Sequence, residues 1–419
     1  MTDFTQRKYD LVVFGATGFT GALTCEYLAE IQDENLSWAL AGRNLGKLEQ
    51  VRDRLATLDP KLQASNLDLL IADATQTTSL DTVLSQTRVV ISTVGPFVKY
   101  GTPLVEACIR QRTHYVDTTG EYPWVKQLID RLDKKAQEKQ IMIVPTCGFD
   151  SIPSDLGVYM VSDYMHSKHN LAVTDVKMSL VHVKGGYSGG TVQSIVEIMT
   201  NKDISGKDQM DPYLLATRQG VDRPSLPMIR RDRDFGDKWQ AFFLMSAVNE
   251  KVVRRSWSIW ADRGQSYGNL FRYKETMTFD FLPALALTLI LYTVVPLAAL
   301  LFKVPFLANK MKSMLPASGD GPDAEQRAKG CFEMQFIATA ETEPYDKTVR
   351  VRGTVKGFRD PGYGDTCRMV AESALCIVKS LKDLPGNGGG ILTPATAFGK
   401  VLLDRLTHNG GMIFEVKDI

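Results

Sequence analysis

Three glycines near the start of the sequence stand at a spacing suited to binding a dinucleotide. Gly15, Gly18 and Gly21 follow an apolar run at 11–14 and precede a helix-compatible run at 22–28. In a strand, turn and helix of this kind, the first glycine allows a tight turn and the second lets backbone approach a pyrophosphate. The third lets the helix pack close to the strand, and the helix N-terminus offers N–H groups to the phosphates. The stretch therefore predicts a nucleotide cofactor site.

The end of the next predicted strand selects the cofactor. Enzymes that use NAD usually place an Asp or Glu there to bind the ribose 2′-OH, whereas NADP needs a cation for its 2′-phosphate. No acid occurs from Leu36 to Gly46, and Arg43 is followed by Asn44 and Lys47. We therefore predict NADP(H), with Arg43 on the 2′-phosphate. The alternative is that Arg43 is an ordinary solvated residue.

Several other residues fall at the ends of predicted strands, where a parallel sheet forms its ligand crevice. We expect Asp73 to face the adenine, and Gly95 and Pro96 to border the nicotinamide half of the cofactor. Glu121 either begins a helix, where the dipole favours an acid, or belongs to the site. The predicted cofactor-binding residues are Gly15, Thr17, Gly18, Phe19, Thr20, Gly21, Arg43, Asp73, Gly95, Pro96 and Cys147.

A regular alternation of strands and helices must position these residues. The strands of this first part are predicted at 11–14, 36–43, 67–72, 88–94, 114–117 and 141–145. Strands separated by helices of this length form a right-handed, doubly wound parallel sheet. We therefore predict an α/β domain over residues 1–160.

The alternation stops near Tyr164, and a second domain of α+β character is predicted over residues 161–419. Polar and apolar residues alternate at 175–183, which predicts a strand with one wet face. Further strands are predicted at 241–260, 331–340, 348–355 and 412–416, and helices at 366–382 and 395–406. A loop at 185–191 is predicted to open a helix through Met199. Their sheet should be mixed or antiparallel.

An apolar run interrupts the second domain. Residues 281–302 carry no charge over 22 positions, which is long enough to span a bilayer. If the run crossed a membrane, the strands before and after it could not join one sheet. We therefore favour insertion into one leaflet or a lipid-droplet surface, as part of an apolar insert at 281–313. The alternatives are a buried core or dimer contact, and a true span.

Composition argues against several classes of protein. The chain has 49 basic and 48 acidic residues and no basic stripe interleaved with aromatics, so nucleic-acid binding is not predicted. The six cysteines lack a C-x-x-C pair and the five histidines are isolated, so we expect free thiols and no metal site. No signal-peptide pattern precedes the first strand. We expect a protein that is not secreted and acts on the cytoplasmic side of a membrane or lipid surface.

With these residues in view, the chain resembles the saccharopine dehydrogenase-like oxidoreductases, a family that includes the mycobacterial trans-acting enoyl reductases. The resemblance covers nearly the whole chain and implies a Rossmann domain, a second α+β domain and NADP-type redox chemistry. The apolar insert resembles that of animal members, which associate with membranes and lipid droplets. The residues that carry the resemblance are Val13–Gly21, Ala41–Arg43, Val94–Phe97, Tyr100, Gly101, Asp117, Gly120, Glu121, Gly148–Pro153, Asp155–Gly157, Val252–Ser256 and Gly390–Pro394.

The resemblance implies reduction of an enoyl or acyl lipid-type substrate, either a small molecule or carrier-bound. Such a site needs donors on the thioester oxygen and an acid or water near the α-carbon. We predict Tyr100 as a donor and Asp150 and Ser151 as orienting groups. Cys147 should line the nicotinamide pocket, because no His partner for a nucleophile is evident.

Several alternatives stay open from the sequence. Arg254 and Arg255 would either receive a phosphopantetheine or CoA phosphate or lie at a solvated strand edge. A saccharopine-type amino-acid adduct as substrate would need paired cations, and no such pair is clearly placed. A non-catalytic lipid-surface protein that keeps the cofactor fold would bind NADPH without oxidising it on acyl substrates. A homodimer is compatible with each of these functions.

Overall fold

The chain divides into two compact units, and the polypeptide passes from one unit to the other three times. The computed structural model describes residues 7–58, 67–185, 210–224, 228–301, 323–342 and 347–419. Unit 1 consists of Met1–Ile152 and Gly362–Gly411, and unit 2 of Pro153–Pro361 and Met412–Ile419. This division differs from the expected one, which kept 161–419 together in a second domain. The segment Gly362–Gly411 returns to unit 1 instead.

Unit 1 is built on a parallel sheet, as predicted. Its strand order is β13-β6-β5-β4-β1-β2-β3. The strands are β1 (Tyr9–Phe14), β2 (Trp38–Gly42), β3 (Asp68–Ile71), β4 (Thr87–Ser92), β5 (His114–Asp117), β6 (Met142–Val144) and β13 (Gly390–Ile391). The order of the strands reverses between β1 and β4, and ligands of doubly wound sheets bind beyond the carboxyl ends of the strands at such a point. The short strand β13 is an addition that the sequence does not predict.

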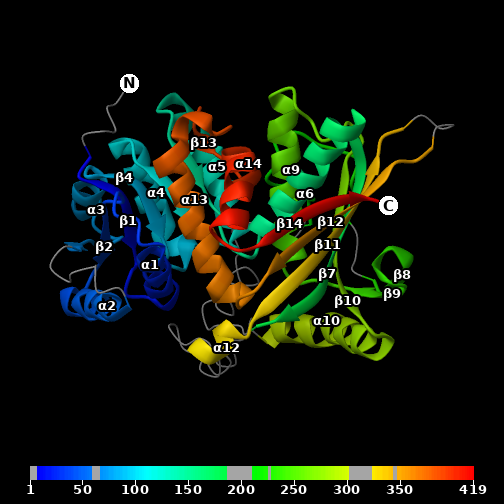
Figure 1. Ribbon diagram of the computed structural model, residues 1–419, viewed down its shortest axis with the longest axis horizontal. Coiled ribbons are helices and arrows are strands. Elements are labelled where there is room, and N and C mark those ends of the chain that lie inside the picture. Colours follow the sequence, from blue (N-terminus) through cyan, green and yellow to red (C-terminus); the bar gives the residue numbers. More distant parts are fainter. Residues whose placement is uncertain (1–6, 59–66, 186–209, 225–227, 302–322, 343–346) are drawn as a thin grey trace. The chain divides into compact units, whose positions relative to one another are not determined.

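Helices cover both faces of this sheet (Figure 1). One face carries α1 (Phe19–Ile31), α2 (Leu45–Leu58), α13 (Thr366–Ser380) and α14 (Pro394–His408), and the other carries α3 (Thr77–Leu84), α4 (Phe97–Gln111) and α5 (Tyr122–Glu138). Helix α13 contacts α1, β4 and β5, and Met369, Val370 and Leu375 are buried along it. Burying these side chains against the parallel sheet explains why the returning segment belongs to unit 1.

Unit 2 is built on a mixed sheet, which confirms the predicted α+β character. Its order is β14-β12-β11-β7-β10-β9-β8. The strands are β7 (Val173–Lys184), β8 (Arg230–Asp232), β9 (Lys238–Ala241), β10 (Arg272–Phe279), β11 (Cys331–Ala340), β12 (Arg350–Gly357) and β14 (Ile413–Asp418). Strands β7 and β10 pair in parallel, and the other pairs are antiparallel. The loop and helix predicted over 185–199 lie almost entirely outside the described residues.

Two helices, α6 (Ile152–Tyr164) and α9 (Ser246–Asp262), pack on one face of the mixed sheet. Helix α6 lies so close that a Cβ on Gly157 would stand 2.3 Å from the Phe336 ring. Helix α9 corrects the prediction of a strand over 241–260. Val252, Val253 and Trp257 favour strands by propensity, but residues all around α9 are buried in unit 2, and this tertiary packing decides the outcome.

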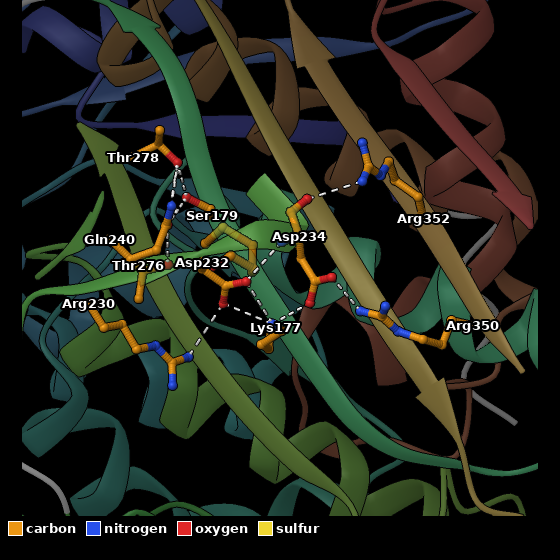
Figure 2. A network of polar contacts seen from close by, with 11 residues as sticks. Lys177, Ser179, Arg230, Asp232, Asp234, Gln240, Thr276, Thr278, Arg350 and Arg352 are labelled. Carbon is orange, nitrogen blue, oxygen red and sulfur yellow. Dashed lines mark hydrogen bonds and ion pairs between the residues drawn. The ribbon is translucent and has the colours of Figure 1, made fainter. Parts of the chain in front are cut away.

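The opposite face of the mixed sheet is polar, as the alternation at 175–183 predicts, but it is not wet, because Ser179 is buried and Lys177 is half-buried. Figure 2 shows Lys177 of β7 between Asp232 and Asp234, with its ammonium 2.8 Å from Asp232 Oδ2. Arg350 of β12 approaches Asp234 Oδ1 to 2.7 Å. Ser179 donates a hydrogen bond to Gln240 Oε1 at 2.7 Å. Ion pairs and hydrogen bonds therefore tie the β8–β9 segment to this face.

The apolar run forms helix α10 (Phe281–Leu301), which contacts β9 and β10. Ala284 is buried, and the rings of Phe281 and Trp239 lie 4.9 Å apart. No helix among the described residues is both long and apolar enough to cross a membrane. A short helix, α12 (Ala324–Ala328), precedes β11. Among the described side chains of α10, the exposed large apolar ones are Phe281, Leu282, Leu289, Ile290, Tyr292 and Leu297.

Candidate functional site

The turn after β1 has a backbone that only glycine can supply. Gly15 has a φ of +93°, in the left-handed region, and a Cβ there would lie 2.7 Å from Val94 Cγ2 and 2.8 Å from Thr93 Oγ1. A Cβ on Gly21 would lie 2.1 Å from the Gly15 carbonyl oxygen. Gly18 donates its N–H to the same oxygen at 2.9 Å. The three glycines therefore draw the start of α1 tightly against the end of β1.

The N-terminus of α1 is available to an anion. Gly18 is the N-cap and provides no side-chain cap, and the first turn carries no acid. Thr17 and Gly18 lie in the turn, and Phe19, Thr20 and Gly21 form the first residues of the helix. Backbone N–H groups and the positive end of the helix dipole suit a pyrophosphate at this place. The geometry of these five residues fits the predicted dinucleotide.

Arg43 is exposed directly after β2, next to the end of β3. Asp73 follows β3, and its Oδ1 accepts hydrogen bonds from the Thr75 N–H and hydroxyl, each at 2.8 Å. These bonds, and more weakly the Arg43 charge, hold the pKa of Asp73 below its ordinary value. Arg43 therefore follows the carboxyl end of β2, the position at which NADP-binding sheets of this kind carry a cation.

Glu121 has a structural role near the carboxyl ends of the parallel strands. Its carboxylate accepts the N–H of Phe97 at 3.0 Å and of Val98 at 2.8 Å, and its side chain is buried. It thus satisfies the first amides of α4, the helix that follows Gly95 and Pro96. Glu121 is also the N-cap residue of α5 (Tyr122–Glu138), so it begins the next helix as one interpretation predicted, although its side chain caps α4 and not its own helix.

Asp117 joins the ends of two neighbouring strands, β5 and β6. Fully buried, it accepts hydrogen bonds from the N–H groups of Thr119 and Thr146, at 2.9 Å and 3.0 Å, and from the Tyr115 hydroxyl. Burial raises its pKa to about 7, although these hydrogen bonds act in the opposite direction. Its backbone carbonyl also accepts the N–H of Cys147 at 2.7 Å. Asp117 therefore fixes the turn that carries Cys147 and Asp150.

The predicted catalytic residues lie at the ends of two strands that β5 separates. Tyr100 is half-buried in the first turns of α4, after β4, and Asp150 and Ser151 lie in the turn after β6. Burial raises the pKa of Asp150 to about 6. Ser151 is fully buried. In the described part of the chain, no hydrogen bond joins Tyr100 to either residue.

Cys147 is an inert thiol in this turn. It is fully buried, its Sγ lies 3.3 Å from the Val144 carbonyl oxygen, and burial raises its pKa. A thiol held in this way is neither a thiolate nor an exposed nucleophile. Among the described residues, no group of three or more His, Cys, Asp and Glu side chains is arranged to hold a metal ion.

Arg254 is engaged inside unit 2. Strand β9 pairs with β10 only from Met277 to Phe279, so among the described residues the earlier part of β10 has no neighbouring strand on that side. Side chains replace the missing strand: Arg254 donates to the Tyr273 carbonyl at 2.7 Å, and Glu250 accepts the N–H of Glu275 at 3.0 Å. Arg254 also pairs with Asp222 at 2.7 Å and with Glu250 at 3.2 Å.

Arg255 is equally buried and donates to the Leu215 carbonyl at 2.7 Å. The prediction that Arg254 and Arg255 receive a phosphate therefore has no support here, and neither lies at a solvated strand edge. Both belong to helix α9, whose assignment as a strand was the source of the error.

The residues after Ile152 form a buried network in unit 2 that the sequence does not reveal. Asn249 of α9 donates to Ser154 at 3.2 Å and to Glu275 Oε2 at 3.0 Å. The Tyr273 hydroxyl donates to Glu275 Oε1 at 2.7 Å. The Ser256 hydroxyl donates a hydrogen bond to Asp155 Oδ1. Ser154 and Asp155 thus anchor α6 to α9, in addition to any capping role.

Glu275 makes the stability of unit 2 depend on pH. Burial raises its pKa to about 7, whereas hydrogen bonds from Tyr273 and Ser154 act in the opposite direction. Between the ordinary pKa of a Glu and this value, the folded chain holds a proton that the unfolded chain has lost, so stability falls as the pH rises through that window. We expect Glu275→Gln to gain about 1–3 kcal/mol of unfolding free energy over the wild type between about pH 5 and about pH 8.

Urea unfolding at several pH values measures this difference directly. Glu415→Gln, at an exposed position of β14, serves as the matched control. A Glu275→Gln difference that stays constant with pH would show that this carboxyl ionises normally in the folded protein.

Comparisons with known proteins indicate the same family for the first unit and for the whole chain. Residues 11–144 match the family model described as the saccharopine dehydrogenase NADP binding domain. Trans-acting enoyl reductases of Mycobacterium ulcerans and Mycobacterium leprae are each 33% identical to this chain, over 97% of it and 98% of their own length. Saccharopine dehydrogenase (L-Glu forming) from Saccharomyces cerevisiae shares the fold, with a TM-score of 0.56 at 12% identity, over 98% of this chain and 100% of that one.

The family model confirms NADP(H) as the cofactor, in agreement with the glycine turn and the cation after β2. The full-length match to the enoyl reductases extends the relationship to unit 2. The chain belongs to the saccharopine dehydrogenase-like oxidoreductase family, which includes the trans-acting enoyl reductases.

Proposed function

We propose that the protein is an NADPH-dependent reductase of an enoyl or acyl thioester, either a small molecule or carried on a protein. The observation that carries the proposal is the full-length similarity to trans-acting enoyl reductases, at 33% identity. The geometry of the NADP site supports it: the turn after β1 leaves a helix N-terminus to the phosphates, and Arg43 supplies the cation for a 2′-phosphate.

The chain's own residues supply the acid and the donors. NADPH, when bound, provides the hydride that reduction of a carbon–carbon double bond requires. A proton must also reach the substrate α-carbon, and Asp150 is the proposed source, because burial raises its pKa to about 6, closer to neutral pH than that of an ordinary Asp. The hydroxyls of Tyr100 and Ser151 are the proposed donors to the thioester oxygen.

Titration calorimetry with NADPH and NADH tests the cofactor half of the proposal. We expect Arg43→Ala to lose about 1.5–3 kcal/mol of NADPH affinity and little NADH affinity, because only NADPH carries the phosphate that the guanidinium contacts. Arg54→Ala is a matched control in α2, where Arg54 pairs with Glu26 at 2.6 Å. Failure to bind either nucleotide would overturn the reductase proposal.

Oxidation of NADPH with trans-enoyl-CoA and acyl-carrier substrates tests the chemical half. The proposal requires turnover that Asp150→Asn reduces while NADPH affinity stays unchanged. Tight NADPH binding without turnover on any enoyl thioester would favour the alternatives, a saccharopine-type dehydrogenase or a non-catalytic protein that keeps the cofactor fold.

We further propose that α10 rests on a lipid surface. Six large apolar side chains are exposed among those of the helix that the structure describes, and of these Leu282 is 72% exposed and Leu297 is 57% exposed. Its other side is fixed to unit 2, because Ala284 is buried and Phe281 contacts Trp239. The sequence continues with Lys303, Lys310 and Lys312, which suit anionic headgroups. An apolar helix face beside cations is typical of proteins that lie in a membrane interface.

Flotation with phosphatidylcholine and phosphatidylserine vesicles tests this location. Each buried leucine is worth about 1.5–3 kcal/mol, so Leu282→Asp with Leu289→Asp should weaken vesicle binding at least about tenfold. Leu270→Asp, at a leucine of unit 2 that is 52% exposed but lies outside α10, is the control. Equal flotation of all three proteins would refute the lipid surface. A dimer that only the α10 variant dissociates would instead assign the face to a second copy.

A further inference from the structure

The carboxylate of Asp150 has no hydrogen bond or ion pair of its own within the part of the chain that the structure describes. Burial is the cause of its raised pKa, and no charged or hydrogen-bonding group adds to it. The place of this proposed acid therefore depends on the backbone of the turn after β6, which runs from Thr146 to Ser151. What holds that backbone also holds the acid.

The turn begins with a strained residue. Thr146 has a φ of +65°, in the left-handed region, which is a genuine outlier for a β-branched side chain. It is buried, and Asp117 Oδ1 accepts its N–H at 3.0 Å. A strained backbone persists only where its surroundings hold it, and such residues gather at active sites. Contacts from other elements therefore impose the shape of this turn.

Thr366, the first residue of α13, supplies a second contact to the turn from 217 positions further along the chain. Its hydroxyl oxygen accepts the N–H of Phe149 at 3.0 Å. Its methyl carbon would lie 3.1 Å from a Cβ on Gly148, so the two pack closely. Thr366 is buried. The hydroxyl and the methyl group thus fix the two residues that precede Asp150.

The start of α13 also contacts the first turn of α1, where the phosphates of the cofactor are expected. The Cys367 thiol lies 3.4 Å from the Thr20 carbonyl oxygen. The ring of Tyr363, just before α13, packs edge-on against Phe19, with the ring centroids 5.0 Å apart. All of these residues lie in unit 1. The segment 363–367 therefore connects the phosphate-binding turn to the turn that carries the acid.

We propose that Thr366 is a positioning residue of the reductase, which holds the turn after β6 so that the Asp150 carboxyl is directed at the site beside α1. The inference rests on the proposed function, because it takes Asp150 as the acid. It deepens that function by giving a role to α13, which lies outside the family model matched at 11–144. Without the Thr366 hydroxyl, the Phe149 N–H loses this acceptor, and the strained turn loses a contact that holds it.

Two substitutions separate the hydroxyl from the methyl group. Thr366→Val keeps the shape of the side chain and removes the acceptor, whereas Thr366→Ser keeps the acceptor and removes the methyl group. We expect Thr366→Val to lower kcat on trans-enoyl-CoA at least about tenfold, with KM and NADPH affinity unchanged, because a small displacement of a reacting group costs up to about a hundredfold in rate. Thr366→Ser should retain most of the wild-type kcat. Thr407→Val is the control, because the Thr407 hydroxyl bonds within its own helix, α14, to the Leu403 carbonyl at 2.9 Å.

NMR titration of the Asp150 carboxyl tests the positioning without any turnover. With isotope-labelled aspartate, and with Asp150→Asn to assign the signal, we expect a pKa of about 6 in the wild type and in Thr366→Ser. In Thr366→Val the pKa should fall toward the ordinary value of an Asp, because a loosened turn lets water reach the carboxyl. Urea unfolding of each variant checks that unit 1 folds.

The outcomes separate this inference from the proposed function. An equal kcat and an equal Asp150 pKa in the wild type and in Thr366→Val would overturn the role of Thr366 and leave the reductase intact. A loss of stability, NADPH affinity and kcat together in both Thr366 variants would also overturn it, because the contact would then be purely structural. If the wild type turns over no enoyl thioester, the proposed function fails, and the NMR titration alone decides whether Thr366 positions Asp150.

Discussion

Arg254→Met is expected to lower the free energy of unfolding by about 3–5 kcal/mol, the usual cost of removing one partner from a buried ion pair. The guanidinium is 3% exposed and bridges Asp222, Glu250 and the carbonyl of Tyr273. Methionine fills much of the same volume, but it leaves two carboxylates without their shared cation and the Tyr273 carbonyl without the Arg254 donor. Urea unfolding followed by tryptophan fluorescence reports the loss, since α9 itself carries Trp257 and Trp260.

An exposed ion pair provides the control for this prediction. Arg218 pairs with Asp262 at the end of α9, and both side chains are more than 40% exposed. We expect Arg218→Met to cost less than about 1 kcal/mol. If Arg254→Met costs no more than Arg218→Met, the buried network does not hold α9 to β10. Adding Asp222→Asn and Glu250→Gln to Arg254→Met should restore part of the lost stability, because no charge is then left unpaired.

Gly21→Ala is expected to weaken NADPH binding by about 10–100-fold. The new methyl group would stand 2.1 Å from the Gly15 carbonyl oxygen and 2.7 Å from Thr93 Oγ1, so backbone must move. Overpacking of this kind costs about 1–3 kcal/mol, and here the displaced backbone is the phosphate-binding turn. Calorimetry with NADPH measures the loss.

Gly46→Ala is the matched control, because a Cβ at Gly46 would meet only Asn44 Oδ1, at the ordinary contact distance of 3.6 Å. Gly46 lies in α2 near Arg43, and its substitution should leave NADPH affinity within about twofold of the wild type. A Gly21→Ala protein with wild-type affinity would mean that the turn does not need the close approach of α1 to β1.

The parts of the structure that depend on neighbouring residues could be predicted from the sequence. The glycine turn is one example, since β1, the turn and α1 lie within Tyr9–Ile31 and each element supports the next. Arg43 is another, because its position at the end of β2 follows from counting along one strand. The doubly wound parallel sheet is a third example, because it follows from the alternation of strands and helices along the chain.

The parts that depend on distant residues could not be predicted. The two alternatives for Arg254 were a phosphate ligand and a solvated strand edge, yet its carboxylate partner is Asp222, which lies 32 positions earlier in the chain. Glu121 caps a helix that begins 24 positions before it. Neither pairing leaves a local pattern, because each is created by packing between elements. The β-favouring residues of α9 led to the wrong prediction of a strand for the same reason, because burial in unit 2 outweighed local propensity.

The threefold passage of the chain between the units has a consequence for how the protein is made. Residues 1–152 leave the ribosome first, yet α13, which completes unit 1, lies in 362–411. At about 5–20 residues per second, the intervening segment takes roughly 10–40 s to synthesise, and throughout that time the part of the sheet that α13 covers, at β4 and β5, lacks its helix. Strand β14, which pairs with β12 in unit 2, is synthesised later still. Both units are therefore completed late in translation, and not one after the other. Until then, the uncovered part of the parallel sheet is the surface that a chaperone would have to shield.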